Sequence, residues 1–498
     1  MASQNPIREA LASKKFFYMV EIVASAKATE ASLGDIAASL AQVPGMVAGS
    51  ITSYAGGSAG HDPIRIGEIA LGRGLTPNIH LTCVNRDLPN FRKALDDIRA
   101  LGIENVFSIS GDYPLTTDTG VKPFYDLDSV QLAELISETR AATGYPFHIS
   151  AAVSPFKYTE PDCMYQYLKM EKKIKAGADY LITQLGYDSR KFRELKRYLD
   201  ERGLKTPVLG NVYILPAGAA RKFSKGEPPG CWAAPELVER IQAEATESTD
   251  KGLAARMERA AKMVAIVRGL GYAGAYLGGD HNADRLKWII ERSEELAPKW
   301  EELAEEISYG KKDGFYLYES KPAPPKPMRP LFRFFDVMAK LFPVKHEDNF
   351  LRRFIAGIMG IVAKSPKAAQ TLEKLELSFK KPVFGCQECG NCVLGEMEYV
   401  CPMTCPKNMR NGPCGGTFGG QCEVIPEQPC IWVAVYENAK VTGRQDGLKV
   451  YIPPRKKALQ GTSAFINLFL NRDNRPEHSE PLVQITGTVE RPRVSAGR

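Results

Sequence analysis

Short apolar runs rich in β-branched residues alternate with longer amphipathic segments through the first three hundred residues. The runs have the length and composition of buried strands, whereas the segments between them repeat apolar residues at intervals of three and four, as helices do. LPNFRKALDDIRALG (88–102) and SRKFRELKRYLDERG (189–203) are two such helical segments. The predicted strands are residues 16–24, 45–52, 78–84, 105–111, 148–154, 180–187, 207–215 and 272–279.

Eight strands, most of them followed by a helix, are typical of a (β/α)8 barrel. We therefore predict an α/β fold with a TIM barrel over residues 1–300. A doubly wound open sheet of similar content is the alternative. In a barrel the active site forms at the carboxyl ends of the strands, so the polar residues there are the candidates for chemistry.

The pattern changes over residues 301–380, which we interpret as a helical and proline-rich linker region. The stretch ESKPAPPKPMRP (319–330) predicts a stiff, extended connection between domains. The basic, aromatic segment 331–366 is compatible with an amphipathic helix on a membrane surface. Packing against the barrel or a partner subunit is the favoured interpretation, because Pro343 would break a continuous helix.

Eight of the eleven cysteines fall between residues 386 and 430, among them a C-x-x-C-x-x-C triplet. This crowding predicts a small metal-binding domain over residues 381–455, followed by a polar tail over residues 456–498. Eight thiolates would satisfy two [4Fe–4S] clusters or, equally, two structural zinc sites. A single closely packed set is more typical of iron–sulfur ligation than of paired zinc knuckles. The predicted ligands are Cys386, Cys389, Cys392, Cys401, Cys405, Cys414, Cys422 and Cys430.

Bulk properties narrow the classes of function. A chain of 498 residues suggests two or three domains, and its formal net charge of +7 gives no argument for nucleic acid. There is no apolar run long enough to predict a transmembrane segment, and the first residues do not resemble a secretory signal. We therefore expect a cytoplasmic protein, in which clustered cysteines are metal ligands rather than disulfides.

Several polar residues stand in or after the predicted strands. Glu21 is an acid among apolar residues, and burial would raise its pKa toward that of a general acid, although pairing with a lysine is equally consistent. A lone strand histidine such as His80 is more often a core residue than a catalyst. Asp112 follows Gly111 at the end of a strand, where a simple Asp turn is the alternative. The Gln184 amide is suited to a polar heterocycle or to the backbone.

Three segments together resemble the methylenetetrahydrofolate reductase family, a flavoprotein (β/α)8 barrel, over roughly residues 15–285. They are VEIVAS around Glu21, the block from Ile79 to Pro114, and KKIKAGADYLITQLGYD (172–188). The resemblance implies reduction of 5,10-methylenetetrahydrofolate to 5-methyltetrahydrofolate, or the reverse, with a folate substrate and hydride delivered by FAD or FMN.

The resemblance also implies roles for single residues. Glu21 would protonate the folate, Asp112 would lie beside the flavin and tune its reduction potential, and Gln184 would hydrogen-bond the pterin. The positions expected to hold the flavin are Thr52, His80, Ser110, Gly111, Asp112, Ser154 and Lys173.

Two departures from the family pattern concern cofactor contacts. Leu215-Pro216 stands where NADH-using bacterial members place an aromatic residue before a proline, and Tyr213 is a substrate-binding candidate two residues earlier. The loop from Ser154 to Tyr158 replaces tyrosine and histidine positions of the simple enzymes. Two questions therefore stay open: whether NADH is the direct electron donor, and whether the flavin is FAD or FMN.

CQECGNC, CPMTCPK and RNGPCGG resemble the cysteine-rich C-terminal domain found with methylenetetrahydrofolate reductases of acetogenic type. That resemblance implies iron–sulfur centres that relay electrons from a ferredoxin-like carrier protein. A structural zinc domain with NAD(P)H as donor is one alternative, and a non-catalytic folate- or flavin-binding scaffold is another. The sequence is compatible with a homo-oligomer.

Overall fold

The computed structural model describes residues 5–53, 60–114, 123–341, 349–476 and 482–483. Eight parallel strands close into a barrel in chain order, and the first strand pairs with the last. The predicted (β/α)8 fold is confirmed, and the open doubly wound sheet is excluded. The strands are β1 (Phe17–Ile22), β2 (Met46–Ile51), β3 (Pro77–Thr82), β4 (Asn105–Ile109), β5 (His148–Val153), β6 (Tyr180–Thr183), β7 (Val208–Tyr213) and β8 (Gly274–Gly278).

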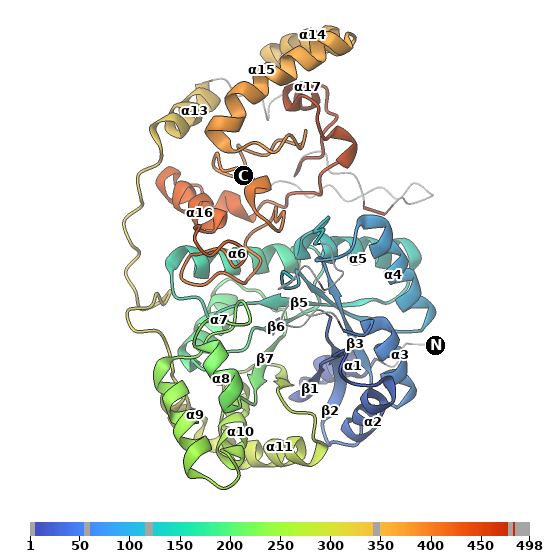
Figure 1. The fold of residues 1–498 in the computed structure, drawn as a ribbon, viewed down its shortest axis with the longest axis vertical. Coiled ribbons are helices and arrows are strands. Elements are labelled where there is room, and N and C mark those ends of the chain that lie inside the picture. Colours follow the sequence, from blue (N-terminus) through green and yellow to red (C-terminus); the bar gives the residue numbers. More distant parts are fainter. Residues whose placement is uncertain (1–4, 54–59, 115–122, 342–348, 477–481, 484–498) are drawn as a thin grey trace.

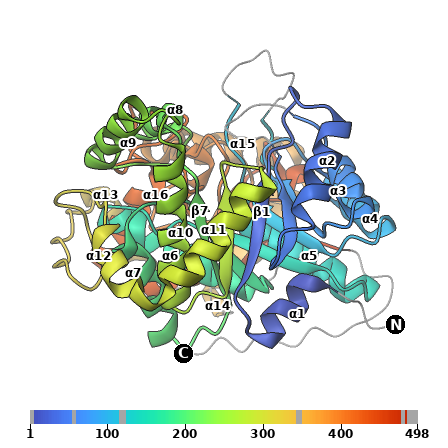
Figure 2. The same ribbon diagram turned by 90° about the horizontal axis from the view of Figure 1, so that it is seen from below.

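Helices surround these strands (Figure 2). Several begin at an aspartate whose side chain accepts a backbone N–H of the first turn, as Asp87, Asp128 and Asp188 do. The helices of the barrel are α2 (Glu30–Leu40), α3 (Pro63–Gly72), α4 (Leu88–Ala100), α5 (Ser129–Thr143), α6 (Glu160–Lys175), α7 (Ser189–Glu201), α8 (Ala217–Phe223), α9 (Pro235–Glu247), α10 (Leu253–Gly269), α11 (Ala283–Leu296) and α12 (Trp300–Glu306).

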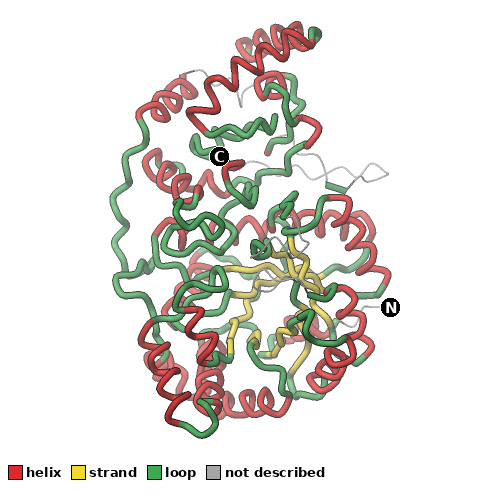
Figure 3. Tube along the Cα trace, viewed as in Figure 1, coloured by secondary structure: helices red, strands yellow, loops and turns green. Residues whose placement is uncertain are grey.

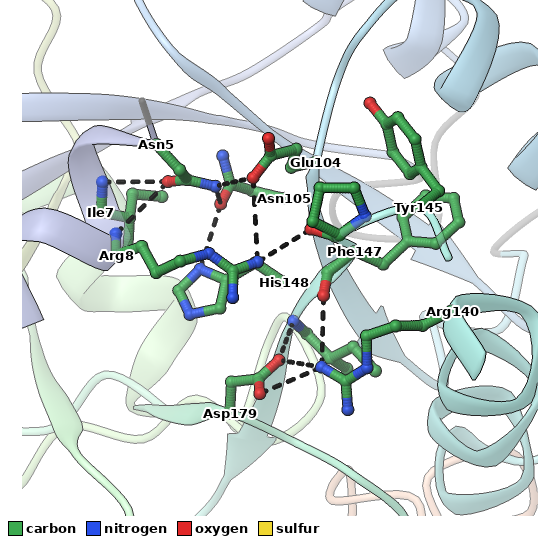
Figure 4. A network of polar contacts seen from close by, with 12 residues as sticks. Asn5, Ile7, Arg8, Glu104, Asn105, Arg140, Tyr145, Phe147, His148 and Asp179 are labelled. Atoms are coloured by element: carbon green, nitrogen blue, oxygen red, sulfur yellow. Dashed lines mark hydrogen bonds and ion pairs between the residues drawn. The ribbon is translucent and has the colours of Figure 1, made fainter. Parts of the chain in front are cut away.

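The helix α1 (Pro6–Ser13) closes the amino-terminal end of the barrel. Ile7 is fully buried and joins the cluster of side chains that fills the barrel interior. Asn5 Nδ2 donates to Glu104 Oε2 and to Asn105 Oδ1, both at 2.8 Å, and the latter oxygen lies 3.2 Å from His148 Nδ1 (Figure 4). With this end sealed, the carboxyl ends of the strands form the open mouth.

The rest of the chain passes along the barrel and folds over its mouth (Figure 1). The cysteine-rich part consists mainly of loops between a few helices (Figure 3). No helix in the described ranges is both long and apolar enough to cross a bilayer. The remaining helices are α13 (Pro330–Leu341), α14 (Phe350–Ala363), α15 (Pro366–Phe384), α16 (Ile431–Thr442) and α17 (Ala464–Phe469).

The folded C-terminal region extends beyond the boundary predicted at residue 455. Ser463, Asn467 and Arg475 are buried, and Asn467 Nδ2 donates to the Gly390 carbonyl at 3.0 Å. Some of the polar residues that predicted a tail after residue 455 are therefore buried and, as Asn467 does, donate hydrogen bonds to carbonyls of loops elsewhere in the region. We call residues 386–476 the module. In the basic, aromatic segment, α14 packs against α15 and α17, and contact with the barrel is not seen for this helix in the described residues. Packing against a partner subunit stays a prediction.

Candidate functional site

A cavity of about 350 Å³ lies at the carboxyl ends of the strands, between the barrel and the module. The fold brings the predicted barrel residues together here, because the ends of parallel strands converge at one mouth. Every barrel residue predicted for the site lines this cavity, namely Glu21, Thr52, His80, Ser110, Gly111, Asp112, Ser154, Lys173, Gln184 and Tyr213.

Glu21 is presented by β1 beside Tyr276 and Asp112. The pKa of Glu21 is raised to about 7, mainly by burial; a hydrogen bond with Tyr276 opposes the shift, and the charge of Asp112 adds to it. Among the residues that the structure describes, no lysine or arginine forms an ion pair with this carboxylate. Near neutral pH the group is therefore divided between its protonated and charged forms, as a proton donor requires.

His80 is a hydrogen-bonded residue of the barrel interior that also reaches the cavity. Its Nε2 lies 2.9 Å from Ser50 Oγ, and its ring packs edge-on against Phe107 with centroids 4.9 Å apart. Burial lowers the pKa of His80 to about 3, so the imidazole stays neutral. It is both a hydrogen-bonded core residue and part of the cavity wall.

The turn after β4 needs its glycine. Gly111 has a φ of +80°, and a Cβ at this position would stand 3.1 Å from Thr82 Cβ. This turn carries Asp112 to the cavity. A residue of the module fixes this turn, because Lys407 Nζ donates to the Gly111 carbonyl at 3.0 Å.

Thr52, Lys173 and Gln184 are each anchored by the backbone. Thr52 Oγ1 accepts the Ala24 N–H at 3.2 Å, and Lys173 Nζ donates to the Ala152 carbonyl at 2.6 Å. Burial lowers the pKa of Lys173 to about 7. Gln184 Oε1 accepts the N–H of the next residue at 2.9 Å, so the backbone alternative holds for that oxygen.

Three buried polar atoms on the cavity wall lack a hydrogen-bond partner within the described part of the chain. They are Ser154 Oγ, Gln166 Nε2 and Asn211 Oδ1. Buried polar groups are normally paired, so a hydroxyl, an amide N–H and an amide oxygen left together indicate a polar ligand. Their chemistry fits the hydrogen-bonding edge of a flavin or a pterin. Asn211 had a sequence signal, a polar residue inside an apolar strand, whereas Gln166 had none.

An aromatic pair occupies the side of the cavity at β7. The rings of Tyr213 and Phe223 pack at a tilt with centroids 5.6 Å apart, and both line the cavity. Leu215, at the position that departs from the family pattern, is buried in the core. Phe223 was missed because it belongs to α8, which lies in the connection after the strand.

The module supplies the opposite wall of the cavity. Lys407 forms a buried ion pair with Glu423, and Glu423 Oε2 lies 3.1 Å from Cys414 Sγ. Sequence reasoning missed these wall residues, because no local pattern shows how two domains dock. The contributing residues are Lys407, Pro413, Cys414, Gly415, Gly416 and Glu423.

Two barrel lysines hold the loop that carries Cys414. Lys157 Nζ donates to the Gly415 carbonyl at 2.7 Å, and Lys169 Nζ donates to the Pro413 carbonyl at 2.9 Å. The departure from the family pattern in the loop after β5 thus serves the contact with the module.

The first four clustered cysteines gather around one small cavity of about 30 Å³, lined by Cys386, Cys389, Cys392 and Cys401. The pKa of Cys401 is raised to about 12, mainly by burial, with smaller contributions from the charges of the other three. All four are free thiols.

The other four cysteines interact among themselves. Burial raises the pKa of Cys414 to about 12, with contributions from Glu423 and Cys405. Burial raises the pKa of Cys405 and that of Cys430. The charge of Cys422 adds to the shift at Cys405, and the charges of Cys414 and Cys405 add to the shift at Cys430. We group the eight thiols in chain order into a first set, Cys386, Cys389, Cys392 and Cys401, and a second set, Cys405, Cys414, Cys422 and Cys430. Within the described ranges, no three or more His, Cys, Asp or Glu side chains are already arranged to hold an ion.

Comparison with known proteins identifies both parts of the chain. Residues 6–268 match the family model described as methylenetetrahydrofolate reductase, and residues 366–458 match that described as methylene-tetrahydrofolate reductase C terminal. The chain is 27% identical over 179 residues to methylenetetrahydrofolate reductase 2 of Schizosaccharomyces pombe, covering 33% of this chain and 27% of that protein. It is 31% identical over 148 residues to methylenetetrahydrofolate reductase (NADH) 1 of Arabidopsis thaliana, covering 27% and 24%.

The matched part spans about a quarter of the length of these curated relatives. A solved structure of an uncharacterized protein from Clostridium thermocellum, which binds two copies of 5-methyl-5,6,7,8-tetrahydrofolic acid, covers 59% of this chain and 99% of its own. At a TM-score of 0.40 and 12% identity, that likeness carries no argument.

Proposed function

This chain belongs to the methylenetetrahydrofolate reductase family, and we propose that it reduces 5,10-methylenetetrahydrofolate to 5-methyltetrahydrofolate, or runs the reverse reaction. The observation that carries the proposal is the position of Glu21. This carboxyl has a pKa of about 7 and lines the same cavity as Asp112 and Gln184. An acid, a nearby charge and an amide for the pterin are therefore available in one place.

In the direction of reduction, the Glu21 carboxyl passes its proton to the folate amine whose bond to the methylene carbon breaks. That carbon is left as an electrophilic iminium. When bound, a reduced flavin supplies the hydride that this carbon accepts. Burial favours the protonated form of Glu21 near neutral pH, and the negative charge of Asp112 adds to this effect because it disfavours a second carboxylate nearby.

Binding of FAD or FMN and of folate is supported by the polar atoms left without partners. Ser154 Oγ, just after β5, Asn211 Oδ1, of β7, and Gln166 Nε2, of α6, have no partner in the described part of the chain, and all three residues line the cavity. A planar heterocycle with both donors and acceptors would satisfy them. The further residues proposed to hold the flavin are Thr52, His80, Ser110, Gly111, Asp112 and Lys173.

Replacing Glu21 by Gln tests the proposal, because the amide keeps the shape but has no proton to give. We expect turnover of methylenetetrahydrofolate to fall by about 10²–10⁴-fold while flavin content is unchanged. Glu68→Gln, on the exposed surface of α3, is the matched control and should keep the parental rate. Parental turnover in Glu21→Gln would remove Glu21 from the mechanism.

We further propose that each set of four cysteines holds one [4Fe–4S] cluster. When bound, these clusters would supply single electrons to the flavin from a ferredoxin-like carrier. Cys414 supports this route, because it belongs to the second set and lines the flavin cavity itself. Analysis of iron and labile sulfide in anaerobically purified protein is the test. Zinc without iron would exclude the relay.

A nicotinamide donor is the second candidate, and the Tyr213–Phe223 pair favours it because aromatic rings on the cavity wall offer a surface against which a planar ring can pack. In this alternative, the module binds structural zinc instead of iron–sulfur clusters. Anaerobic reduction of the flavin by NADH or NADPH, compared with reduced ferredoxin, separates the two. If neither of these donors nor a folate reduces the bound flavin, the protein is a binding scaffold and not a reductase.

A further inference from the structure

Helix α14 exposes apolar side chains that a soluble helix normally buries. None of its residues is buried, and Phe350, Phe354 and Ile361 are 83%, 58% and 71% exposed. With Ile358 between them, these residues recur at intervals of four, four and three, which places them on one face of the helix. α14 packs against α15 and α17, so this face forms a convex apolar stripe.

The neighbouring helices continue the apolar surface. Phe334 and Leu341 of α13 are 56% and 65% exposed, and Leu375 of α15 is 64% exposed. The rings of Phe335 and Phe379 lie 5.4 Å apart and join α13 to α15. All three helices lie at the end of the molecule farthest from α11 (Figure 1). We call α13, α14 and α15 the helical arm.

Charge distinguishes the arm from the rest of the protein. Residues 329–385 contain eleven Lys and Arg and five Asp and Glu, a formal +6 of the chain's +7. The acids within the helices are withdrawn from the surface: Asp336 and Glu376 are buried, and Glu373 is half-buried. The exposed charged residues of the three helices are all cations, namely Arg333, Lys340, Arg353, Lys367, Lys374 and Lys381.

We propose that the helical arm binds the surface of a bilayer that contains anionic phospholipids. A second copy of the chain would bring two cationic faces together, whereas anionic head groups complement an apolar stripe flanked by lysine and arginine. The 14 residues of α14 span roughly 21 Å, less than the ~30 Å hydrocarbon core. The helix therefore lies along the interface, with its phenylalanine and isoleucine side chains inserted.

Vesicle flotation of the full-length holoprotein tests this binding. We expect the protein to float with phosphatidylcholine–phosphatidylglycerol vesicles and not with phosphatidylcholine alone, and added salt should weaken the binding. The triple variant Phe350→Ser, Phe354→Ser, Ile361→Ser should lose it. Leu71→Ser with Trp288→Ser, at barrel positions 41% and 40% exposed, is the matched control and should bind as the parent does.

A second variant removes charge and leaves the apolar stripe intact. Arg333→Gln, Lys367→Gln and Lys374→Gln together should weaken vesicle binding by about fivefold for each cation removed. Failure of the parent to bind anionic vesicles, or parental binding by the apolar triple variant, would overturn the proposal. A parental dimer that the apolar triple variant dissociates would also overturn it, because a second copy would then cover the face.

Discussion

Lys407 Nζ, in the module, donates a hydrogen bond of 3.0 Å to the carbonyl of Gly111, in the turn that ends β4. The same ammonium group pairs with Glu423, whose Oε2 lies 3.1 Å from Cys414 Sγ. An unbroken series of polar contacts thus connects the turn proposed to hold the flavin with a cysteine proposed to bind metal. Lys407 is therefore one of several buried groups, with Lys157 and Lys169, that hold the two parts together.

Lys407→Met should therefore destabilise the protein. It leaves the Glu423 carboxylate buried without its partner and the Gly111 carbonyl without its donor, a loss of about 3–5 kcal/mol in the free energy of unfolding. Urea unfolding and flavin content measure the effect. Lys225→Met, at an exposed position, is the control. An unchanged urea midpoint in Lys407→Met would show that the ion pair does not hold the two parts together.

Glu21→Gln should change how stability depends on pH. The folded-state pKa of Glu21 is raised from 4.5 to about 7, so the parent loses stability as the pH rises between these values. Glutamine does not titrate. The variant should therefore gain stability over the parent above neutral pH, by roughly 3 kcal/mol at most, relative to their difference below pH 4.5. Urea titrations at about pH 4.5 and 8 measure this, and a pH-independent difference would contradict the raised pKa.

Ser154→Ala should weaken flavin binding without changing stability, whereas Ser108→Ala should lower stability without changing flavin binding. Ser154 Oγ has no hydrogen-bond partner among the residues that the structure describes, so its removal should leave the stability of the flavin-free protein unchanged and weaken flavin binding about tenfold. Ser108 Oγ donates to the Ser129 carbonyl at 2.8 Å, so its loss should lower stability by about 1 kcal/mol and leave flavin binding intact. Fluorescence titration with flavin and urea unfolding distinguish them. Equal flavin affinity in both variants would exclude Ser154 from the cofactor site.

Pairs of cysteine substitutions should test the grouping of the thiols. Cys401→Ser alone should lower the metal content by about half, and adding Cys386→Ser should lower it no further, because both belong to the first set. Adding Cys405→Ser instead should remove the remaining metal, although Cys405 is only four residues away in sequence. Cys163→Ser, a buried barrel thiol, is the control. If the double variant Cys401→Ser, Cys405→Ser retains half of the metal, the assignment of these two cysteines to different sets is wrong.

The barrel was predictable from local patterns. Each strand is a short apolar run bounded by helical periodicity. Seven of the eight predicted runs contain an observed strand, and the eighth, 78–84, overlaps β3, which begins one residue earlier. Once the barrel is assumed, its geometry brings Glu21, Asp112 and Gln184 to one mouth, although they are far apart in sequence. Their pKa shifts and hydrogen bonds needed the structure.

The wall formed by the module could not be predicted. Lys407 and Glu423 belong to a loop-rich segment without periodicity, and the partner of Lys157 lies more than 250 residues away. The buried polar residues after position 455 resembled a tail, because their role depends on carbonyls elsewhere in the fold. Docking of this kind is a long-range property that no local pattern encodes.

The shared cavity also sets an order of events during synthesis. The barrel strands end at Gly278, and domains generally fold as they leave the ribosome, amino-terminal first. The opposite wall, with Lys407, Cys414 and Glu423, is translated much later. A nascent chain therefore carries a folded barrel with an open mouth, and both walls of the cavity are present only after residue 423 has been made. Cofactor loading is accordingly expected to be a late, post-translational step.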